Sequence, residues 1–140
     1  MLQYIKTVLS LNSNQRYLKN SNNNKSVLVV DDEHDIVNLI KQSLEPNGFQ
    51  AYIFIEPSAA LEHFISHSKD YDIVISDIRM PGMNGYEFIR NVKENNPKVK
   101  VILMTAFEID DKEFHNVLSD IKLDAFLQEN QSLRVINLQR

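Results

Sequence analysis

Short apolar runs rich in β-branched residues alternate with amphipathic or polar stretches along most of this 140-residue chain. Such runs are typical of buried strands, whereas apolar residues at i, i+3 and i+4 are typical of helices. The predicted strands cover residues 27–30, 50–55, 72–76, 99–104 and 125–127. The predicted helices cover residues 36–44, 57–65, 84–94, 110–119 and 132–139.

This alternation predicts right-handed βαβ crossovers and a parallel sheet with helices on both faces. Five such units match the α/β, flavodoxin-like (βα)5 doubly wound fold with strand order 2-1-3-4-5. We expect residues 26–140 to form this one domain. Residues 1–25, rich in Asn and Ser, have too little apolar surface to offset the entropy of ordering, so we expect a flexible extension. It is either a tail without a specific role or a docking element.

Composition excludes several classes of protein. The chain has no cysteine, which excludes disulfides and thiolate metal sites. Its formal net charge of -4 gives no electrostatic basis for direct nucleic-acid binding. No apolar run approaches the ~20 residues that span a bilayer, and the N-terminus lacks a signal-type apolar block. We therefore expect a cytoplasmic protein without a membrane span.

Carboxylates follow the first and third predicted strands. Asp31 and Asp32 come directly after residues 27–30, and Asp77 comes after residues 72–76. In the order 2-1-3-4-5 these strands are neighbours, and ligands bind where their carboxyl ends meet. Three carboxylates repel one another unless protons or a cation compensate, and oxygen ligands suit Mg²⁺. One aspartate could then attack phosphorus. For Asp31 and Asp32 alone, helix capping is the alternative.

Thr105 and Ala106 follow the fourth predicted strand and would face the same cleft. The Thr105 hydroxyl could donate a hydrogen bond to a phosphoryl oxygen, and the small Ala106 would leave room for that group. A Thr-Ala pair by itself is more often a turn. After Asp77, Pro81 and Gly82 predict a turn, and Asn84 predicts the cap of the next helix.

Three motifs in combination resemble the receiver domain of two-component response regulators, over about residues 26–140. They are Val29-Val30-Asp31-Asp32-Glu33, Asp77-Ile78-Arg79-Met80-Pro81-Gly82-Met83-Asn84-Gly85 and Met104-Thr105-Ala106. The resemblance implies that Asp77 accepts a phosphoryl group from a histidine kinase or phosphotransfer protein. It implies a Mg²⁺ site made of Asp31, Asp32, Asp77 and the backbone carbonyl of Arg79. It also implies that Thr105 and Ala106 contact the phosphoryl group and that Thr105 and Phe126 act as switch residues.

One position departs from the family pattern. The fifth strand of the family normally reads aromatic, apolar, any residue, Lys, Pro, whereas Phe126-Leu127-Gln128 is followed here by Glu129-Asn130. A lysine would neutralise the carboxylates and contact the phosphoryl group, and a glutamate cannot. Glu129 would add a fourth carboxylate, strengthen divalent-cation binding or turn to solvent.

The leading interpretation is a single-domain response regulator, a phosphoacceptor and not an enzyme, that is a monomer or weak homodimer. Because the sequence ends at Arg140 without an effector domain, we expect output through a protein partner or a phosphorelay step. One alternative is a degenerate receiver that serves as an interaction module. Another is a metal-dependent phosphohydrolase, which would be expected to carry a general acid two residues after its nucleophile, where this chain has Arg79.

Overall fold

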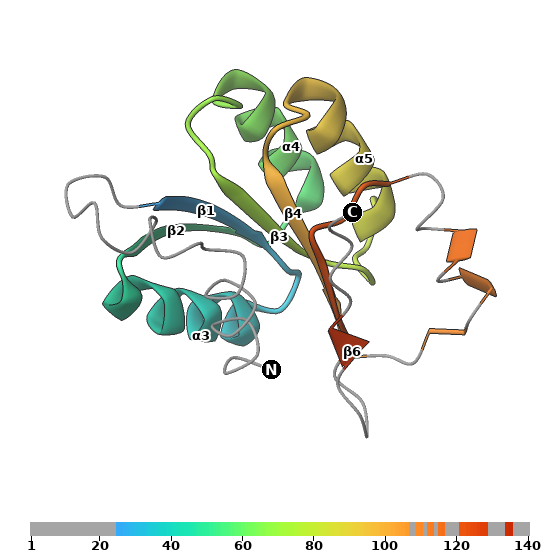
Figure 1. Cartoon of the computed structure of the whole chain (residues 1–140). Coiled ribbons are helices and arrows are strands. Elements are labelled where there is room, and N and C mark those ends of the chain that lie inside the picture. The colour runs from blue at the N-terminus through green and yellow to red at the C-terminus, as the bar shows by residue number, and fades with distance from the viewer. Residues whose placement is uncertain are drawn as a thin grey trace.

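A six-stranded sheet forms the centre of the computed structural model, which describes residues 25–106, 109–110, 112–113, 115–116, 121–128 and 134–135 (Figure 1). The strands lie in the order β2-β1-β3-β4-β5-β6. Their bounds are β1 Lys25–Val30, β2 Phe49–Phe54, β3 Ile73–Asp77, β4 Lys100–Thr105, β5 Ala125–Gln128 and β6 Arg134–Val135. The first five strands are parallel, which confirms the predicted flavodoxin-like order 2-1-3-4-5.

Helices cover both faces of this sheet. Figure 1 shows α4 (Pro57–Ser66) and α5 (Gly85–Asn95) on one face and α3 (His34–Leu44) on the other. A single 3-10 turn, η1 (Glu45–Asn47), follows α3. Residues 112–113 and 115–116 are also helical, inside the helix predicted over 110–119.

Local sequence explains where these helices begin and end. The Asn84 side chain accepts a hydrogen bond from the Glu87 N–H at 2.9 Å, which confirms Asn84 as the N-cap of α5. After η1, Gly48 has φ 87°, a backbone conformation that favours glycine, and the chain turns there into β2.

Two apolar clusters lie on opposite faces of the sheet. Leu28, Val74 and Leu103 belong to the cluster that includes Phe64 of α4 and Phe88 of α5. Neighbouring strand residues on the other face pack with α3, and they include Val27, Val29, Ile75 and Ile102. A strand that is buried on both faces reads as a continuous apolar run, which is why the strands were visible in the sequence.

The end of the chain departs from prediction. The predicted helix over 132–139 is wrong at Arg134 and Val135, which form β6 and pair antiparallel with β5. Without this pairing β5 would be an edge strand with one row of unpaired backbone N–H and C=O groups. An antiparallel edge strand on a parallel sheet is common in doubly wound folds. The rest of that predicted helix lies outside the described residues.

β1 begins at Lys25, two residues before the predicted strand. The Ser26 N–H donates to Asp72 Oδ2 at 3.0 Å, and Lys25 Nζ lies 3.7 Å from Asp72 Oδ1, so both residues are held beside the start of β3. The predicted extension before Lys25 lies outside the residues that the structure describes. Among the described residues, no helix is long and apolar enough to span a bilayer.

Candidate functional site

Three carboxylates meet at the carboxyl edge of the sheet. Asp31 and Asp32 follow β1, Asp77 ends β3, and the two strands are direct neighbours with Val30 paired to Ser76. One carboxylate oxygen from each aspartate lies within 4.8 Å of the others. The predicted meeting of these three side chains is therefore present in the fold.

The three aspartates differ in exposure. Asp31 is only 5% exposed, Asp77 is half-buried and Asp32 faces solvent. The Glu33 N–H donates to Asp31 Oδ1 at 3.0 Å, which aims the Asp31 carboxylate across the turn. Glu33, not Asp31 or Asp32, is the N-cap residue of α3, and its side chain makes no capping hydrogen bond. The capping alternative thus does not describe Asp31 and Asp32.

Burial and mutual repulsion perturb the two inner carboxyl groups. Burial, together with the charges of Asp77 and Asp32, raises the pKa of Asp31 to about 7 against the opposing effect of the Glu33 N–H. Burial, together with the charges of Asp32 and Glu33, raises the pKa of Asp77 to about 6, and the backbone N–H groups of Ile78 and Arg79 oppose this rise. The cluster therefore needs protons or a cation to offset its charge.

This donor set fits a hard divalent cation. All three side chains offer oxygen, Asp32 keeps the cluster open to water, and Mg²⁺ is usually held by one or two carboxylates with water completing its shell. Within the part of the chain that the structure describes, this is the one group of three metal-ligating side chains.

The loop after Asp77 is held by backbone bonds beneath the carboxylates. The Ile78 N–H donates to the Met104 carbonyl at 3.1 Å, and the Gly85 N–H donates to the Ile78 carbonyl at 2.9 Å. The Ser76 hydroxyl donates to the Asp77 carbonyl at 2.8 Å. Gly82 has φ 85°, in the turn that the sequence predicts. The phosphoacceptor candidate therefore sits on a fixed backbone.

Gly85 permits this arrangement because α5 begins directly against the loop. A Cβ on Gly85 would collide with the Asp77 carbonyl oxygen and lie 2.8 Å from the Ile78 Cα. Both contacts are with backbone, which cannot move aside as a flexible side chain would. The sequence contained this glycine within the motif, but its packing role could not be inferred without the close approach.

A family model described as the response regulator receiver domain matches residues 27–134, which include all three aspartates. The chain belongs to this family. Receiver domains of this kind are found in two-component response regulators. The family consists of regulatory phosphoacceptor domains that interact with histidine kinases or phosphotransfer proteins. Its members generally bind Mg²⁺ at an acidic pocket.

Individual relatives agree with this receiver family. The alkaline phosphatase synthesis transcriptional regulatory protein PhoP of Bacillus subtilis is 28% identical over 115 residues, 81% of this chain and 46% of that protein. Sporulation initiation phosphotransferase F of Bacillus subtilis is 32% identical over 88 residues, 62% of this chain and 69% of that protein. A response regulator receiver domain protein from Clostridium thermocellum has a TM-score of 0.67 at 26% identity, over 77% of this chain and 84% of that one. The chain spans less than half the length of PhoP.

The remaining site residues of this receiver domain come from β4 and β5. Thr105 ends β4 with 1% exposure, one residue beyond Met104, which pairs with Asp77. Ala106 follows and is exposed, while Phe126 lies buried in the core on the side of α4 and α5. Gln128 was not predicted as a site residue, yet it is 6% exposed and pairs with Thr105. Its signal in the sequence is a polar side chain within an apolar strand.

Glu129 and Asn130, which stand where the family normally has Lys and Pro, lie outside the described residues.

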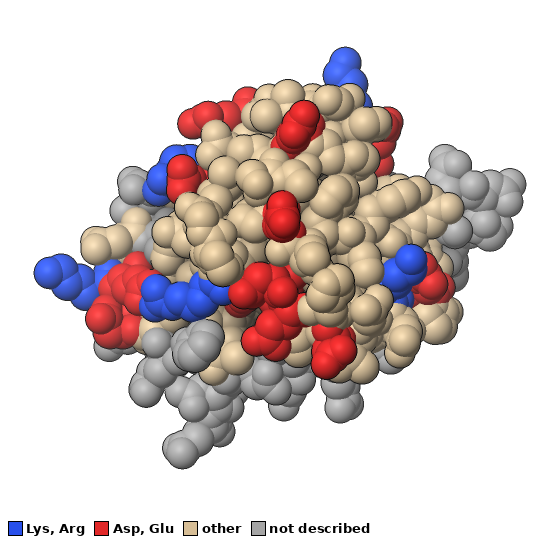
Figure 2. Space-filling view, turned by 180° about the vertical axis from the view of Figure 1, so that it is seen from behind, with Lys and Arg blue, Asp and Glu red and all other residues tan. Residues whose placement is uncertain are grey.

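Among the described residues, acidic and basic side chains are interspersed on the face of the molecule that Figure 2 shows.

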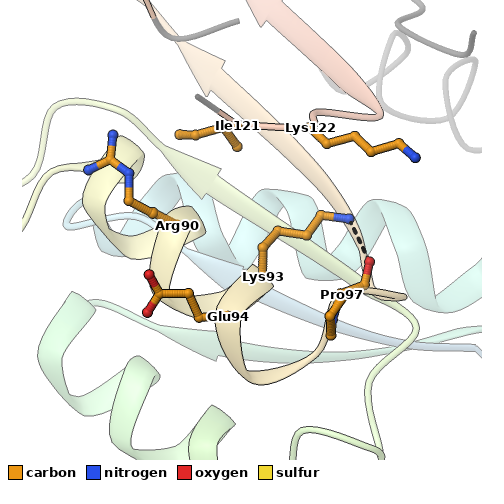
Figure 3. Close-up of a pocket in the computed structure, with 6 residues that line it drawn as sticks. All are labelled: Arg90, Lys93, Glu94, Pro97, Ile121 and Lys122. Atoms are coloured by element: carbon orange, nitrogen blue, oxygen red, sulfur yellow. Dashed lines mark hydrogen bonds between the residues drawn. The ribbon is translucent and has the colours of Figure 1, made fainter. Parts of the chain in front are cut away.

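A hollow of about 530 Å³ lies at the opposite edge of the sheet, between α5 and the residues before β5 (Figure 3). Lys93 in its wall donates to the carbonyls of Pro97 at 3.3 Å and Val99 at 2.6 Å, so its charge is used to join α5 to the start of β4. Figure 3 shows Arg90 and Lys122 directed away from each other. These cations do not converge on a common point, and the hollow is not built as an anion site.

Proposed function

We propose that this receiver domain accepts a phosphoryl group on Asp77 and passes the signal to a partner protein. The observation that carries the proposal is the half-buried Asp77 carboxylate beside Asp31 and Asp32, with oxygens within 4.8 Å, at the edge where β1 and β3 end. A carboxylate held on a rigid strand end, next to a site for a divalent cation, is the arrangement that phosphoryl transfer to aspartate requires.

In this reaction an Asp77 carboxylate oxygen attacks phosphorus. The O–P bond forms while the N–P bond of a donor phosphohistidine breaks, and that electron pair stays on the imidazole nitrogen. Asp31, Asp32, Asp77 and the backbone carbonyl of Arg79 would hold Mg²⁺, which neutralises charge on the phosphoryl oxygens when bound. The Ile78 N–H, which donates to the Met104 carbonyl at 3.1 Å, holds the backbone next to the attacking carboxylate in place.

Three further residues would contact the phosphoryl group or respond to it. Thr105 would donate its hydroxyl to a phosphoryl oxygen, and Ala106 would leave space for that group. Phe126, buried in the core beside β4, would respond to movement of Thr105 as the switch aromatic. Their support is position, because β4 lies next to β3 and β5 lies next to β4.

The partners follow from the same chemistry. The phosphodonor would be a histidine kinase or a phosphotransfer protein, and the output would be a downstream protein bound by a single receiver unit over residues 26–140. The family match over residues 27–134 and the likeness to a relative named sporulation initiation phosphotransferase F support this assignment. We place the exchange in the cytoplasm, where a two-component kinase would deliver the phosphoryl group.

Intact-mass spectrometry after incubation with acetyl phosphate and Mg²⁺ tests the proposal. We expect a mass gain of one phosphoryl group in the wild type and none in Asp77→Asn. Asp35→Asn, which changes an exposed aspartate in the first turn of α3, is the matched control and should gain the group.

The two alternative hypotheses, a degenerate receiver and a phosphohydrolase, predict different results. Failure of both acetyl phosphate and phosphohistidine donors would overturn the proposal and favour the degenerate receiver that acts as an interaction module. Repeated hydrolysis of p-nitrophenyl phosphate, lost in Asp77→Asn, would instead favour the phosphohydrolase.

A further inference from the structure

Glu113 collects two hydrogen-bond donors from a different part of the chain. Arg79 Nη2 lies 3.1 Å from Glu113 Oε1 and 3.2 Å from Oε2, and the Tyr86 hydroxyl donates to Oε1 at 3.2 Å. The Glu113 side chain is 27% exposed and that of Arg79 is 47% exposed. We call this three-residue contact the clasp.

The clasp joins the segments that leave the two central strands. Arg79 lies two residues after Asp77, the last residue of β3. Tyr86 is in the first turn of α5. Glu113 lies beyond β4, where Asp110 Oδ1 accepts the Glu113 N–H at 2.7 Å and fixes that helical turn. A change at Asp77 can therefore reach the turn after β4 through one residue.

Charge decides how Arg79 would respond to phosphorylation. The Arg79 guanidinium contacts Glu113, and among the described residues no hydrogen bond or ion pair joins it to the Asp77 carboxylate. A phosphoryl group carries more negative charge and more acceptor oxygens than a carboxylate. Arginine is well suited to phosphate because its planar fork binds two oxygens at once. The phosphoryl group would thus be the stronger partner.

The two donors of the clasp are not equivalent. Burial raises the pKa of the Tyr86 hydroxyl, and the Glu113 carboxylate raises it further, so Tyr86 stays a neutral donor and has no charge to attract it to a phosphoryl group. The Arg79 side chain is 47% exposed, so solvent screens its ion pair with Glu113 and the pair can be exchanged for a stronger one.

We propose that a phosphoryl group on Asp77 competes with Glu113 for Arg79, and that departure of Arg79 frees the helical residues 112–113 and 115–116. This regulation rests on the proposed function. It also gives the site a cationic side chain where Glu129 replaces the lysine of the family pattern.

Amide NMR spectra with and without Mg²⁺ and beryllofluoride, a phosphoryl mimic, test the exchange. In the wild type we expect shifts at Ile78 and Gly85, beside Asp77, and also at Glu113 and Asn116. Arg79→Gln keeps the Arg79 backbone but removes the guanidinium, so the mimic is added until the shifts at Ile78 and Gly85 saturate. At that saturation the response at Glu113 and Asn116 should be lost. Glu113→Gln weakens the hold on Arg79, so its Asn116 amide should already be shifted, without the mimic, toward the position that the wild type reaches with the mimic.

The Lys41–Glu45 pair provides a matched control, because it is an exposed ion pair of 3.7 Å between α3 and η1. Lys41→Gln should leave every one of these responses unchanged. Shifts at Glu113 that persist in Arg79→Gln would overturn the exchange and leave phosphoacceptance standing. An absence of shifts at Ile78 and Gly85 in the wild type would overturn both, since the mimic would then not occupy Asp77.

Discussion

The two edges of the sheet treat buried charge in opposite ways. At the amino edge, the partly buried Lys93 ammonium meets two backbone carbonyls and lies 3.9 Å from Asp124 Oδ2. At the carboxyl edge, Asp31 and Asp77 are buried beside further carboxylates, and backbone N–H groups oppose their raised pKa values only in part. The buried charge at the amino edge is compensated by other groups of the chain, whereas the buried charge at the carboxyl edge requires protons or a cation.

This difference separates a structural charge from a functional one. Burial lowers the pKa of Lys93, but Asp124 opposes that change and the carbonyls satisfy its donors. At Asp31, burial and the neighbouring charges act in the same direction. Uncompensated like charges at the carboxyl ends of parallel strands are therefore the basis of the proposed cation site, and the hollow beside Lys93 has none.

Gly85→Ala should have the largest effect on the carboxyl edge. The added Cβ would collide with the Asp77 backbone, so we expect a loss of about 3 kcal/mol in the free energy of unfolding. Urea unfolding followed by circular dichroism measures this loss. Gly48→Ala is the comparison, because Gly48, unlike Gly85, has a positive φ but no neighbouring atom within 4 Å, so its loss reports backbone conformation alone. A loss in Gly85→Ala no larger than the loss in Gly48→Ala would contradict the importance of close packing at Gly85.

Lys93→Met removes the compensated charge at the amino edge. The carbonyls of Pro97 and Val99 and the Asp124 carboxylate would lose a donor, and we expect the free energy of unfolding to fall by about 2 kcal/mol. The same urea titration measures it, with Lys98→Met as an exposed lysine control. An increase in stability would contradict the view that this charge is satisfied.

Asp31→Asn should raise the free energy of unfolding, whereas Gly85→Ala and Lys93→Met should lower it. In EDTA at pH 8 it removes one of the repelling charges, so we expect the free energy of unfolding to rise by about 1 kcal/mol. Asp35→Asn, on the exposed face of α3, should change it little. A loss of stability in Asp31→Asn would mean that its hydrogen bond from Glu33 outweighs the repulsion.

The pH dependence of stability gives a smaller test of the same edge. The folded pKa values of about 7 for Asp31 and about 6 for Asp77 exceed the ordinary value of 3.8. Between these values the folded state binds more protons than the unfolded state, so in EDTA stability should fall as the pH rises from about 4 to 7. Urea titrations across this range measure the slope.

The double variant Asp31→Asn, Asp77→Asn should have a flatter profile. Burial lowers the pKa of His63, so the contribution of His63 to stability rises with pH and opposes that of the carboxylates. Because both proteins keep His63, the difference between their profiles reports the carboxylates alone. Identical slopes in the two proteins would contradict the raised pKa values.

The sequence predicts those parts of this molecule that local periodicity and strand order determine. The alternation of apolar runs with helical patterns led to the order 2-1-3-4-5, and that order placed Asp31, Asp32 and Asp77 at one edge. Asn84 was predicted as a cap because capping needs only a residue and its neighbours.

Other features depend on contacts between distant residues. Arg79 meets Glu113 across 34 positions, and nothing in either local pattern pairs them. The pairing of β6 with β5 depends on the free edge of β5, which competes with the weak helical pattern of residues 132–139. The burial of Gln128 depends on its place beside Thr105 in the finished sheet.

Isothermal titration calorimetry with MgCl₂ at pH 8 tests the central claim most directly, because it asks whether the carboxyl edge takes up the cation that its charges require. We predict one binding site in the wild type, loss of binding in Asp31→Asn and Asp77→Asn, and unchanged binding in Lys93→Met. At pH 5.5, protons on Asp31 and Asp77 should weaken the wild-type affinity. No binding at pH 8, or binding that survives Asp31→Asn and Asp77→Asn unchanged, would contradict the account.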